Sequence, residues 1–313
     1  MGGRPAPARL PGFVVIASFY TVWLFSIMFT FLAIPAWLLF GYRLPVQFLV
    51  AYYFVRMFWR PAHWPAFHQF ASRLINRSPY FNSQRLIFQS EHAKPPPNSS
   101  TLFAVFPHGA LCVGWTVNLN LSPIMQAMQV EYLGASMLFR LPLISEVLTW
   151  ASSSSASARN MKRLMKTGKN LALLPGGFDE AAFYRRHRYD VFVRHRKGFI
   201  KYAMQHGYKI SPVFTFGEEA TYFALESGSD FRRALAKKKI PGIVFWSRLL
   251  WLPDPNIDLV TVVGDPIEIP HVAHPTADQV DKCHANFVAA LQSIFDTYKA
   301  DYAGSPHATI HIH

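Results

Sequence analysis

A stretch of 33 residues without a charged side chain, Leu10–Tyr42, constrains this chain more than any other feature. Crossing the apolar core of a bilayer takes about 20 helical residues, whereas the apolar part of a signal peptide has roughly 7–15. Soluble helices rarely run so far without a charge, so a buried soluble helix is the weaker alternative. We therefore expect a membrane segment here.

Apolar character continues to Val55 and is broken only by Arg43, which at about 1.5 Å per residue is close to two spans of helix. We expect an N-terminal transmembrane helical hairpin within residues 1–60. Its turn lies at Pro35 or in the Gly41–Pro45 region. The later turn is favoured, because the earlier one puts Arg43 inside the second leg at up to about 2.5–3.5 kcal/mol. It leaves a short second leg that can also lie in the interface.

Arginines flank the apolar run on both sides, at positions 4, 9, 56 and 60. Positively charged residues favour the cytosolic side of a membrane, so both ends of the hairpin are expected there. The two cysteines, Cys112 and Cys283, are too few and too far apart for a disulfide framework. This agrees with a catalytic part that faces the reducing cytosol.

Composition narrows the class of partner. Only 16% of the 313 residues are charged, against about 25% in soluble domains, and 27 are phenylalanine, which suits contact with lipid. The net charge of +13 favours an anionic bilayer surface or a phosphorylated cofactor. Nucleic acid is not expected, because no helix-turn-helix, zinc-finger or RNA-recognition signature is present.

The remainder of the chain alternates between short apolar runs and helical stretches. Residues 61–98 are mixed, aromatic and basic, which predicts an amphipathic linker. Residues 99–313 then predict one α/β domain with a mostly parallel sheet flanked by helices. Five runs are typical of buried strands: Leu102–Phe106, Val130–Leu133, Leu171–Leu174, Ile210–Phe214 and Leu259–Val263. A last long helix is marked by Thr276 and Gln279, which have capping-box spacing.

Two short motifs follow directly on predicted strands. In Phe106-Pro-His-Gly109 the histidine is expected at the edge of the sheet near a helix N-terminus, where a neutral imidazole can take a proton from an alcohol. In Leu174-Pro-Gly-Gly177 the backbone N–H groups can form an anion nest, and Glu180 can hold the far nitrogen of His108. The alternatives are an ordinary polar loop and a glycine turn before a helix.

A basic segment, Arg185–Lys197, carries six arginines and lysines against the single acid Asp190. It predicts either a clamp for phosphate groups, such as those of coenzyme A, or a solvated basic face. The sequence has no G-x-S-x-G elbow, P-loop, H-E-x-x-H motif or paired C-x-x-C motif. It therefore gives no support for a lipase, an NTPase or a zinc enzyme.

Taken in order, these blocks resemble the diacylglycerol O-acyltransferase type 2 family, which includes monoacylglycerol and wax-alcohol acyltransferases. The resemblance runs from about Tyr80 to Lys299. Its most specific stretch starts at Arg196-Lys-Gly-Phe199 and continues through Lys201, Ala203, Gly207, Pro212 and Phe216-Gly217-Glu218, with Gly264-Asp-Pro-Ile267, Pro275-Thr276 and His284 further on. It implies a glycerolipid-acyltransferase-like core behind a membrane hairpin, at the endoplasmic reticulum and lipid-droplet surface. Acyl-CoA is the implied co-substrate, with no metal and no other cofactor.

We expect His108 as the general base and Glu180 as its carboxylate partner, with Gly109, Gly176 and Gly177 supplying backbone N–H groups to the oxyanion. The residues expected to bind acyl-CoA are Arg196, Lys197, Gly198 and Lys201. Those expected to line the lipid path are Phe103, Phe106, Trp115, Phe139 and Phe178. The chain departs from the family in two places: Phe106 replaces a histidine, and Tyr80-Phe81-Asn82 replaces Tyr-Phe-Pro.

The expected reaction is direct acyl transfer from acyl-CoA to the hydroxyl of diacylglycerol. A two-chain acceptor needs a wide apolar site, and no charged residue occurs between Leu102 and Val130. Monoacylglycerol and a long-chain alcohol are the alternative acceptors, and monoacylglycerol would require a polar partner for its second hydroxyl. A non-catalytic lipid-binding or droplet-coating protein is the alternative from another class. The sequence leaves homo-oligomerisation open.

Overall fold

A mixed sheet forms the centre of the molecule. The computed structural model describes residues 10–225, 232, 235 and 242–313, and within them the sheet has seven strands in the order β1-β10-β7-β2-β5-β3-β4. Within this sheet only β10 and β7 pair antiparallel, so the expected mostly parallel sheet is confirmed. The strands are β1 Ser83–Phe88, β2 Thr101–Phe106, β3 Glu131–Gly134, β4 Ser153–Ser155, β5 Leu171–Leu173, β7 Lys209–Phe216 and β10 Asp258–Val263.

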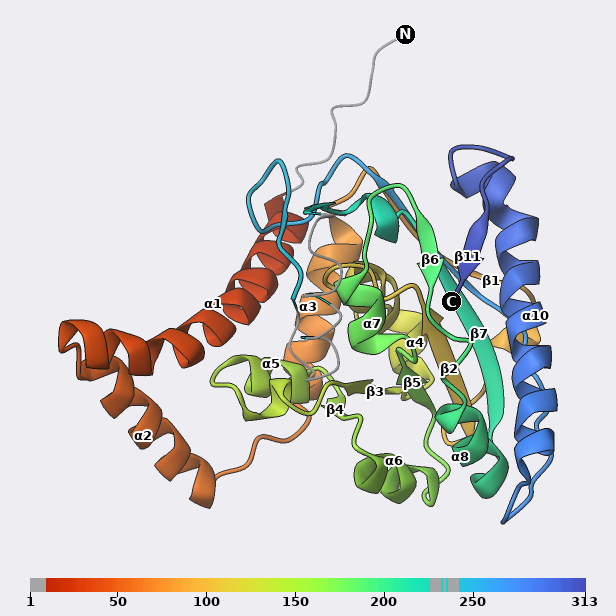
Figure 1. Cartoon of the computed structure of the whole chain (residues 1–313), viewed down its shortest axis with the longest axis horizontal. Helices are drawn as coiled ribbons and strands as arrows, with labels where there is room; N and C mark the ends of the chain where they lie inside the picture. Colours follow the sequence, from red (N-terminus) through yellow and green to blue (C-terminus); the bar gives the residue numbers. More distant parts are fainter. Residues whose placement is uncertain (1–9, 226–231, 233–234, 236–241) are drawn as a thin grey trace, which may run out of the picture.

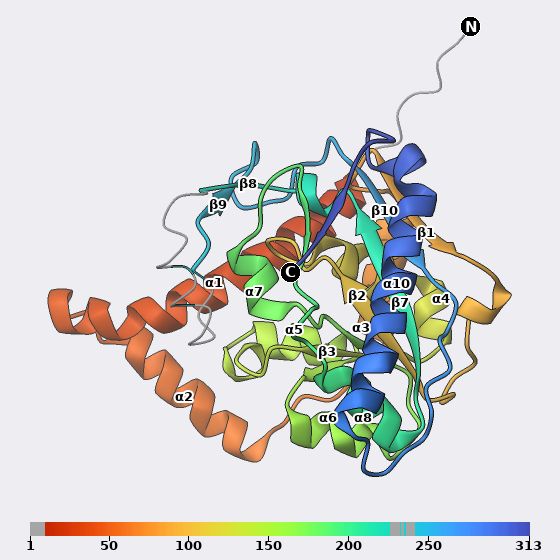
Figure 2. The same cartoon turned by 45° about the vertical axis from the view of Figure 1, so that its right-hand side comes forward.

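Helices cover both faces of this sheet (Figures 1 and 2). One face packs against α6 (Ala158–Met165), α8 (Gly198–His206) and α10 (Ala277–Tyr302); the other packs against α1 (Leu10–Phe40), α3 (Pro65–Arg77), α4 (Pro123–Ala127) and the π-helical segment η2 (Trp115–Asn120). Strand β2 serves both faces, because its side chains alternate: Leu102, Ala104 and Phe106 join the α10 side, and Phe103 and Val105 the other.

The remaining elements are short. They are α2 Leu44–Phe58, η1 Glu91–Ala93, η3 Leu138–Arg140, α5 Ile144–Trp150, α7 Gly177–Ala182, β6 Tyr189–Val191, η4 Glu218–Ala220, β8 Phe223–Ala224, β9 Phe245–Trp246 and β11 Ile310–Ile312. The predicted capping box begins α10: the Thr276 hydroxyl accepts from the Gln279 N–H, and the Gln279 side chain accepts from the Thr276 N–H.

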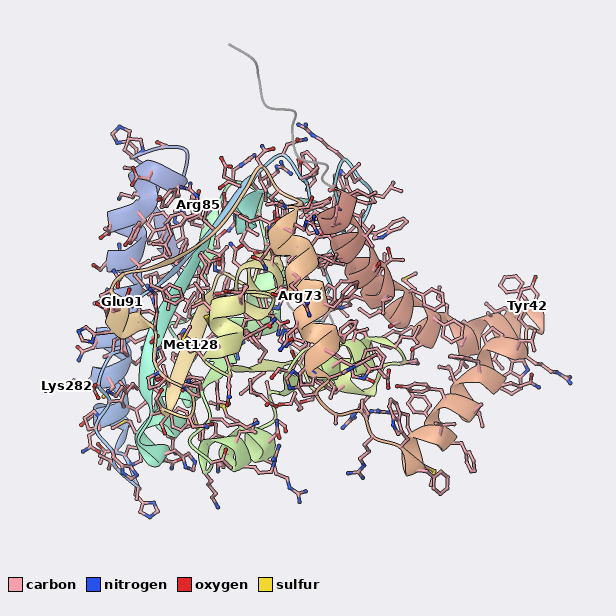
Figure 3. All side chains as sticks on the ribbon, turned by 180° about the vertical axis from the view of Figure 1, so that it is seen from behind. Tyr42, Arg73, Arg85, Glu91, Met128 and Lys282 are labelled. Atoms are coloured by element: carbon pink, nitrogen blue, oxygen red, sulfur yellow. The ribbon has the colours of Figure 1, made fainter. Side chains whose placement is uncertain are left out.

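Helices α1 and α2 form an arm (residues 10–58) that projects from the body in two views, with Tyr42 at its tip (Figures 1 and 3). The break between them is at Gly41–Arg43, where Gly41 has a φ of 73°. Pro35 lies inside α1, so the turn is at the later of the two predicted positions. By length and composition, α1 is the one described helix able to cross a membrane. Large apolar side chains are exposed along the arm, among them Phe25, Phe31, Leu38, Leu39, Phe40, Phe48, Phe54 and Phe58.

The arm is attached to the body near both of its ends. In α1, Ile16 and Tyr20 are buried in the same cluster as the α3 residue Ile75. In α2, the Tyr52 hydroxyl donates to Glu146 Oε1 at 2.8 Å and Arg56 pairs with the same oxygen at 3.2 Å. Glu146 is buried on α5, so a charged contact holds this end. Of the four flanking arginines, those at positions 4 and 9 lie outside the described residues.

The segment 61–98, expected to be a linker, contributes directly to the body. It contains α3, which packs against α1, and β1, which pairs in parallel with β10 at one edge of the sheet. Both elements were missed because their apolar residues are interleaved with basic and aromatic ones. The sheet therefore begins before the expected domain boundary at residue 99.

Close packing of α1 on the body gives a testable expectation. A Cβ atom on Gly12 would lie 2.1 Å from the Ser78 carbonyl oxygen, a backbone atom that cannot move alone. Gly12→Ala should therefore lower the free energy of unfolding by about 1–3 kcal/mol, the usual effect of overpacking. Chemical denaturation of the purified protein in detergent measures this change. Ser18→Ala, on the exposed side of α1, is the control; equal stability of the two variants would show that α1 is not packed as described.

Candidate active site

The His108 loop (residues 107–112) leaves β2 and leads into the helical turn that starts at Val113. Nδ1 of His108 lies 3.0 Å from the Gly109 carbonyl oxygen. A carbonyl only accepts, so Nδ1 carries the proton and Nε2 is left with its lone pair. The Cys112 sulfur lies 3.3 Å from Nδ1 and 3.1 Å from Nε2, so it contacts the ring beside both nitrogens. Burial lowers the pKa of His108, which keeps the imidazole neutral and leaves the lone pair of Nε2 able to accept a proton.

Glu180 holds the backbone of this loop rather than the imidazole. Its Oε2 accepts from the backbone N–H of His108 at 2.6 Å, and its Oε1 accepts from the Phe192 N–H at 2.8 Å. The expected contact with the far nitrogen of His108 is therefore wrong. The physical reason is that the loop's own carbonyl, at Gly109, already orients Nδ1. Glu180 instead links the loop to the basic segment.

A second buried carboxylate, Glu218, holds the other end of the loop. It follows β7 and accepts from the N–H groups of Val113 at 2.9 Å and Gly114 at 2.6 Å. These are the first N–H groups of the helical turn, which have no partner within the helix, so the helix start near His108 is occupied by Glu218. Sequence reasoning did not assign it a role, although it ends the Phe216-Gly217-Glu218 block.

Two of the predicted oxyanion glycines make room for these carboxylates. A Cβ atom on Gly109 would lie 2.3 Å from Glu218 Oε1, and one on Gly176 would lie 2.0 Å from Glu180 Cδ. A side chain at either position would displace the carboxyl group beside it, and Gly109 also has a φ of 61°. Gly177 has a φ of 52° and no atom within 4 Å of such a Cβ, so its constraint is conformational. The role of all three in stabilising an oxyanion stays a prediction.

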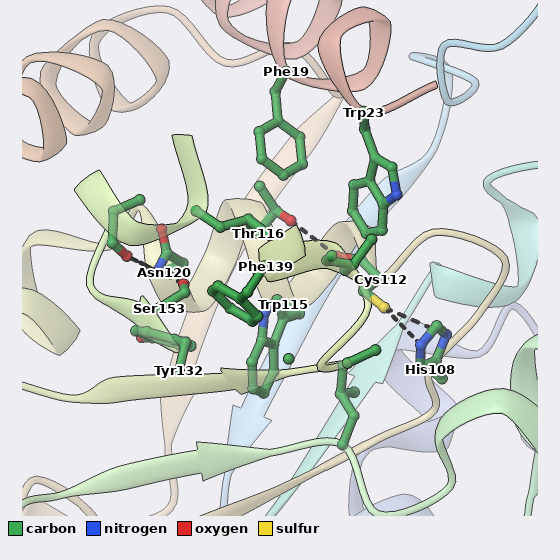
Figure 4. A pocket seen from close by; sticks show the side chains of 16 residues that line it. Phe19, Trp23, His108, Cys112, Trp115, Thr116, Asn120, Tyr132, Phe139 and Ser153 are labelled. Carbon is green, nitrogen blue, oxygen red and sulfur yellow. Dashed lines mark hydrogen bonds between the residues drawn. The ribbon is translucent and has the colours of Figure 1, made fainter. Parts of the chain in front are cut away.

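His108 and Cys112 open onto a cavity of about 90 Å³ (Figure 4). Trp115 and Phe139, two of the residues predicted to line the lipid path, line this cavity, and Phe19 and Trp23 of α1 complete its wall. The sequence gave no sign that the apolar helix would form part of the site. The other lining residues are Thr116, Asn120, Tyr132, Gly134, Ala135, Leu138, Leu148, Ala151, Ser153 and Leu174.

Three predicted lining residues lie elsewhere. Phe106 is fully buried in the α10 layer, with its ring centroid 6.1 Å from that of Phe287. Phe103 is buried among the residues of the opposite layer, and Phe178 is half-buried on α7; neither lines the cavity. Strand alternation and tight burial explain why the two β2 residues, Phe103 and Phe106, lie in the core and not at the cavity.

Most of the arginine and lysine side chains of the basic segment form ion pairs with acidic residues. Arg185 and Arg188 both pair with Asp190, at 3.3 and 3.2 Å, and Arg196 pairs with Asp179. Further pairs join Arg186 to Asp254 and Lys197 to Asp281. A second pocket, of about 10 Å³, touches both this segment and the His108 loop, through Arg185, Arg188, Pro107 and Gly109. Gly198 begins α8 and Lys201 is exposed on it.

The comparisons with known proteins decide the family. The family model for diacylglycerol acyltransferase matches residues 40–313. The chain belongs to this family. Diacylglycerol O-acyltransferase 2 of Dictyostelium discoideum is 30% identical over 221 residues, covering 65% of this chain and 67% of the relative.

Relatives with other acceptors in their names are about as similar. Human 2-acylglycerol O-acyltransferase 3 is 27% identical, covering 69% of each chain. Human acyl-CoA wax alcohol acyltransferase 1 is 29% identical, covering 67% of this chain and 69% of the relative. The chain thus spans about two thirds of the length of the relatives it matches. Family membership therefore makes it a relative of acyltransferases without selecting an acceptor.

Among solved structures, the 1-acyl-sn-glycerophosphate acyltransferase of Thermotoga maritima matches with a TM-score of 0.45 and 12% identity, covering 89% of this chain and 96% of that one. In the described part of the chain, no three histidine, cysteine or acidic side chains gather in a way that could hold a metal ion.

Buried carboxyl groups predict how stability depends on pH. Burial raises the pKa of Glu180 and Glu218 to about 8 and that of Glu219 to about 7, while backbone N–H bonds act in the opposite sense. The folded state then keeps protons that the unfolded state, with an ordinary value near 4.5, releases. Stability is present at low pH and falls as pH rises through this window.

The melting temperature should therefore decrease between about pH 5 and pH 8, as measured by thermal unfolding in detergent at constant ionic strength. Glu180→Gln should flatten part of this slope, whereas Glu268→Gln, on the surface, should leave it unchanged. A melting temperature that rises over the same window would mean that the carboxyl groups are buried as anions.

Proposed function

We propose that the protein is an acyl-CoA-dependent O-acyltransferase that esterifies diacylglycerol to triacylglycerol, with His108 as general base. The observation that carries the proposal is the state of His108. Its Nδ1–H is committed to the Gly109 carbonyl, and its basic Nε2 lies beside an apolar cavity. A neutral imidazole in that setting suits removal of a proton from a lipid hydroxyl.

The proposed reaction transfers the acyl group directly from acyl-CoA to the acceptor hydroxyl. Nε2 takes the proton of the acceptor hydroxyl while the hydroxyl oxygen attacks the thioester carbonyl, and the C–S bond then breaks. The coenzyme A thiolate leaves and is protonated by the imidazolium. The Cys112 sulfur lies 3.1 Å from Nε2 in the free protein, so the acceptor hydroxyl must approach Nε2 beside this sulfur.

The oxyanion of the transition state requires donors. Backbone N–H groups of Gly109, Gly176 and Gly177 are the proposed source, and removal of one such donor in other enzymes costs about 2.7–4 kcal/mol. Glu180 and Glu218 act as positioning residues, because they bind the loop backbone at His108, Val113 and Gly114. Their contribution is to fix the loop before substrate arrives.

The arm supports delivery of the acceptor from a membrane. Phe19 and Trp23 belong both to α1 and to the cavity wall, so a lipid that contacts the arm can reach His108 without crossing water. We propose that the arm inserts as a hairpin whose two attached ends lie on the cytosolic side. The proposed locations are the endoplasmic reticulum membrane and lipid droplets.

His108→Ala tests the proposal. Loss of a general base should lower kcat by about 10²- to 10⁴-fold with little change in melting temperature, because the loop backbone keeps its bonds to Glu180 and Glu218. The assay supplies purified protein with labelled oleoyl-CoA and, in parallel, diacylglycerol, monoacylglycerol and hexadecanol. His92→Ala, on an exposed turn, is the control. Retention of more than about a tenth of the wild-type rate contradicts a base at His108.

The proposed acyl-CoA surface comprises Arg196, Lys197, Gly198 and Lys201. Arg196 and Lys197 have carboxylate partners, so Lys201 gives the cleaner test. Lys201→Glu should raise the KM for oleoyl-CoA several-fold and make it more dependent on salt, since exposed charges are screened. Lys299→Glu on α10 should change neither quantity. An unchanged KM in Lys201→Glu would leave this face as a solvated basic surface.

A further inference from the structure

A hairpin of residues 244–252, called here the tryptophan loop, presents large apolar side chains to the outside of the body. Its first strand, β9, pairs with β8, and bridges between Ser247 and Leu250 and between Leu249 and Leu252 hold its turn. Single exposed apolar residues are ordinary, whereas several together mark a binding surface. The outward side chains are Val244, Trp246, Leu249 and Leu250, which are 59%, 47%, 40% and 67% exposed.

The tryptophan loop is anchored from its inner side, so the exposure belongs to a defined structure. Leu252 is buried in the core that also contains Tyr222, and Phe245 packs on the same core with its ring centroid 5.0 Å from that of Tyr222. Leu250 has a φ of 63°, a conformation that a leucine adopts only at a cost. It is also the most exposed of the four outward residues. Its backbone and its side chain are thus both unfavourable in water, which calls for a partner.

The loop is attached to the apolar arm. Trp251 Nε1 donates to Thr21 Oγ1 of α1 at 3.0 Å. Figure 2 shows β8 and β9 beside α1, on the side of the body from which the arm projects. At 3.6 residues per turn, Thr21 points away from Phe19 and Trp23, the two α1 residues of the cavity wall. This turn of α1 therefore lies between the cavity and the tryptophan loop.

We propose that the tryptophan loop inserts into the interface of the phospholipid leaflet that the arm enters, as a second membrane contact. The inference rests on the proposed insertion of the arm and not on the proposed reaction. Tryptophan is enriched at the level of the lipid headgroups, and leucine beside it can bury in the adjoining acyl region. Arg248 lies in the turn with 66% of its side chain exposed and only a 3.7 Å contact to Asp254, so it can reach lipid phosphate.

A lipid surface fits the loop better than a protein partner does. The loop lines neither the cavity nor the second pocket, so it offers no groove to a partner's side chain. From Thr21, the same face of α1 continues one and two turns further to the exposed Phe25 and Met28. Because α1 is the described helix able to cross a membrane, a fluid bilayer can cover helix and loop together. Contact at the loop would then hold the cavity wall at the membrane surface.

A fluorescent NBD label on Leu250→Cys tests the contact. Cys112 and Cys283 are buried, so the wild type gives the background of labelling. The full chain is reconstituted in nanodiscs of phosphatidylcholine and phosphatidylserine that carry a nitroxide either near the headgroup or deep in the acyl chain. We expect the shallow nitroxide to quench the label about twofold more than the deep one, because the loop lies at headgroup level. Trp246→Cys should behave alike and replaces Leu250→Cys if that variant does not fold.

Lys282→Cys is the negative control, because it is exposed on α10 at the opposite end of the molecule from Tyr42 (Figure 3). Phe40→Cys, at the end of α1, reports insertion of the arm by itself. The inference is overturned if position 250 is quenched no more than position 282. It is also overturned if the label at 250 responds only when the protein dimerises, which would make a second copy the partner. An unquenched label at position 40 counts against the proposed hairpin, and position 250 still decides the loop contact.

Discussion

Two buried carboxylates hold the loop on which the rest of the site depends. Glu180 reaches it from α7 and Glu218 reaches it from the end of β7, and each carboxyl group accepts two backbone N–H groups. Because these bonds involve backbone, they set the path of the loop whatever side chains it carries. The glycines at 109 and 176 follow from the same constraint, since a Cβ atom at either position would collide with a carboxyl group. His108 is then oriented by a carbonyl of its own loop, and no carboxylate contacts its ring in the described structure.

Helix α1 has two functions that are usually separate. Its first half is a structural element of the body, with Ile16 and Tyr20 in a core that also contains Val113 and Leu259. Its second half is exposed and apolar to the turn at Gly41. Phe19 and Trp23 lie between these parts and contribute to the cavity wall. An exposed apolar segment and a cavity wall are thus parts of one continuous helix, so the cavity cannot be described without α1.

Patterns of local residues predicted the parts of this structure that depend on local physics. The five apolar runs became strands because each is buried on both faces, and Thr276 begins α10 because its hydroxyl satisfies a free N–H. His108 was located because it follows a strand directly. Contacts between distant segments were not accessible: the sequence suggests Glu180 for the ring of His108 instead of the backbone, and Glu218 gains its significance only from the N–H groups that surround it. Phe106 was placed in the lipid path because aromatic composition does not distinguish a core from a cavity, whereas its ring packs on Phe287.

The two attachments of the arm also fix the side of the body from which its tip projects. Tyr20 holds one end to the Leu111 carbonyl, and Arg56 and Tyr52 hold the other to the buried Glu146. A tip that projects from two fixed ends can enter a bilayer only from the side on which the body sits. On the proposed insertion, the acceptor is therefore drawn from a single leaflet and the product is released into that same leaflet.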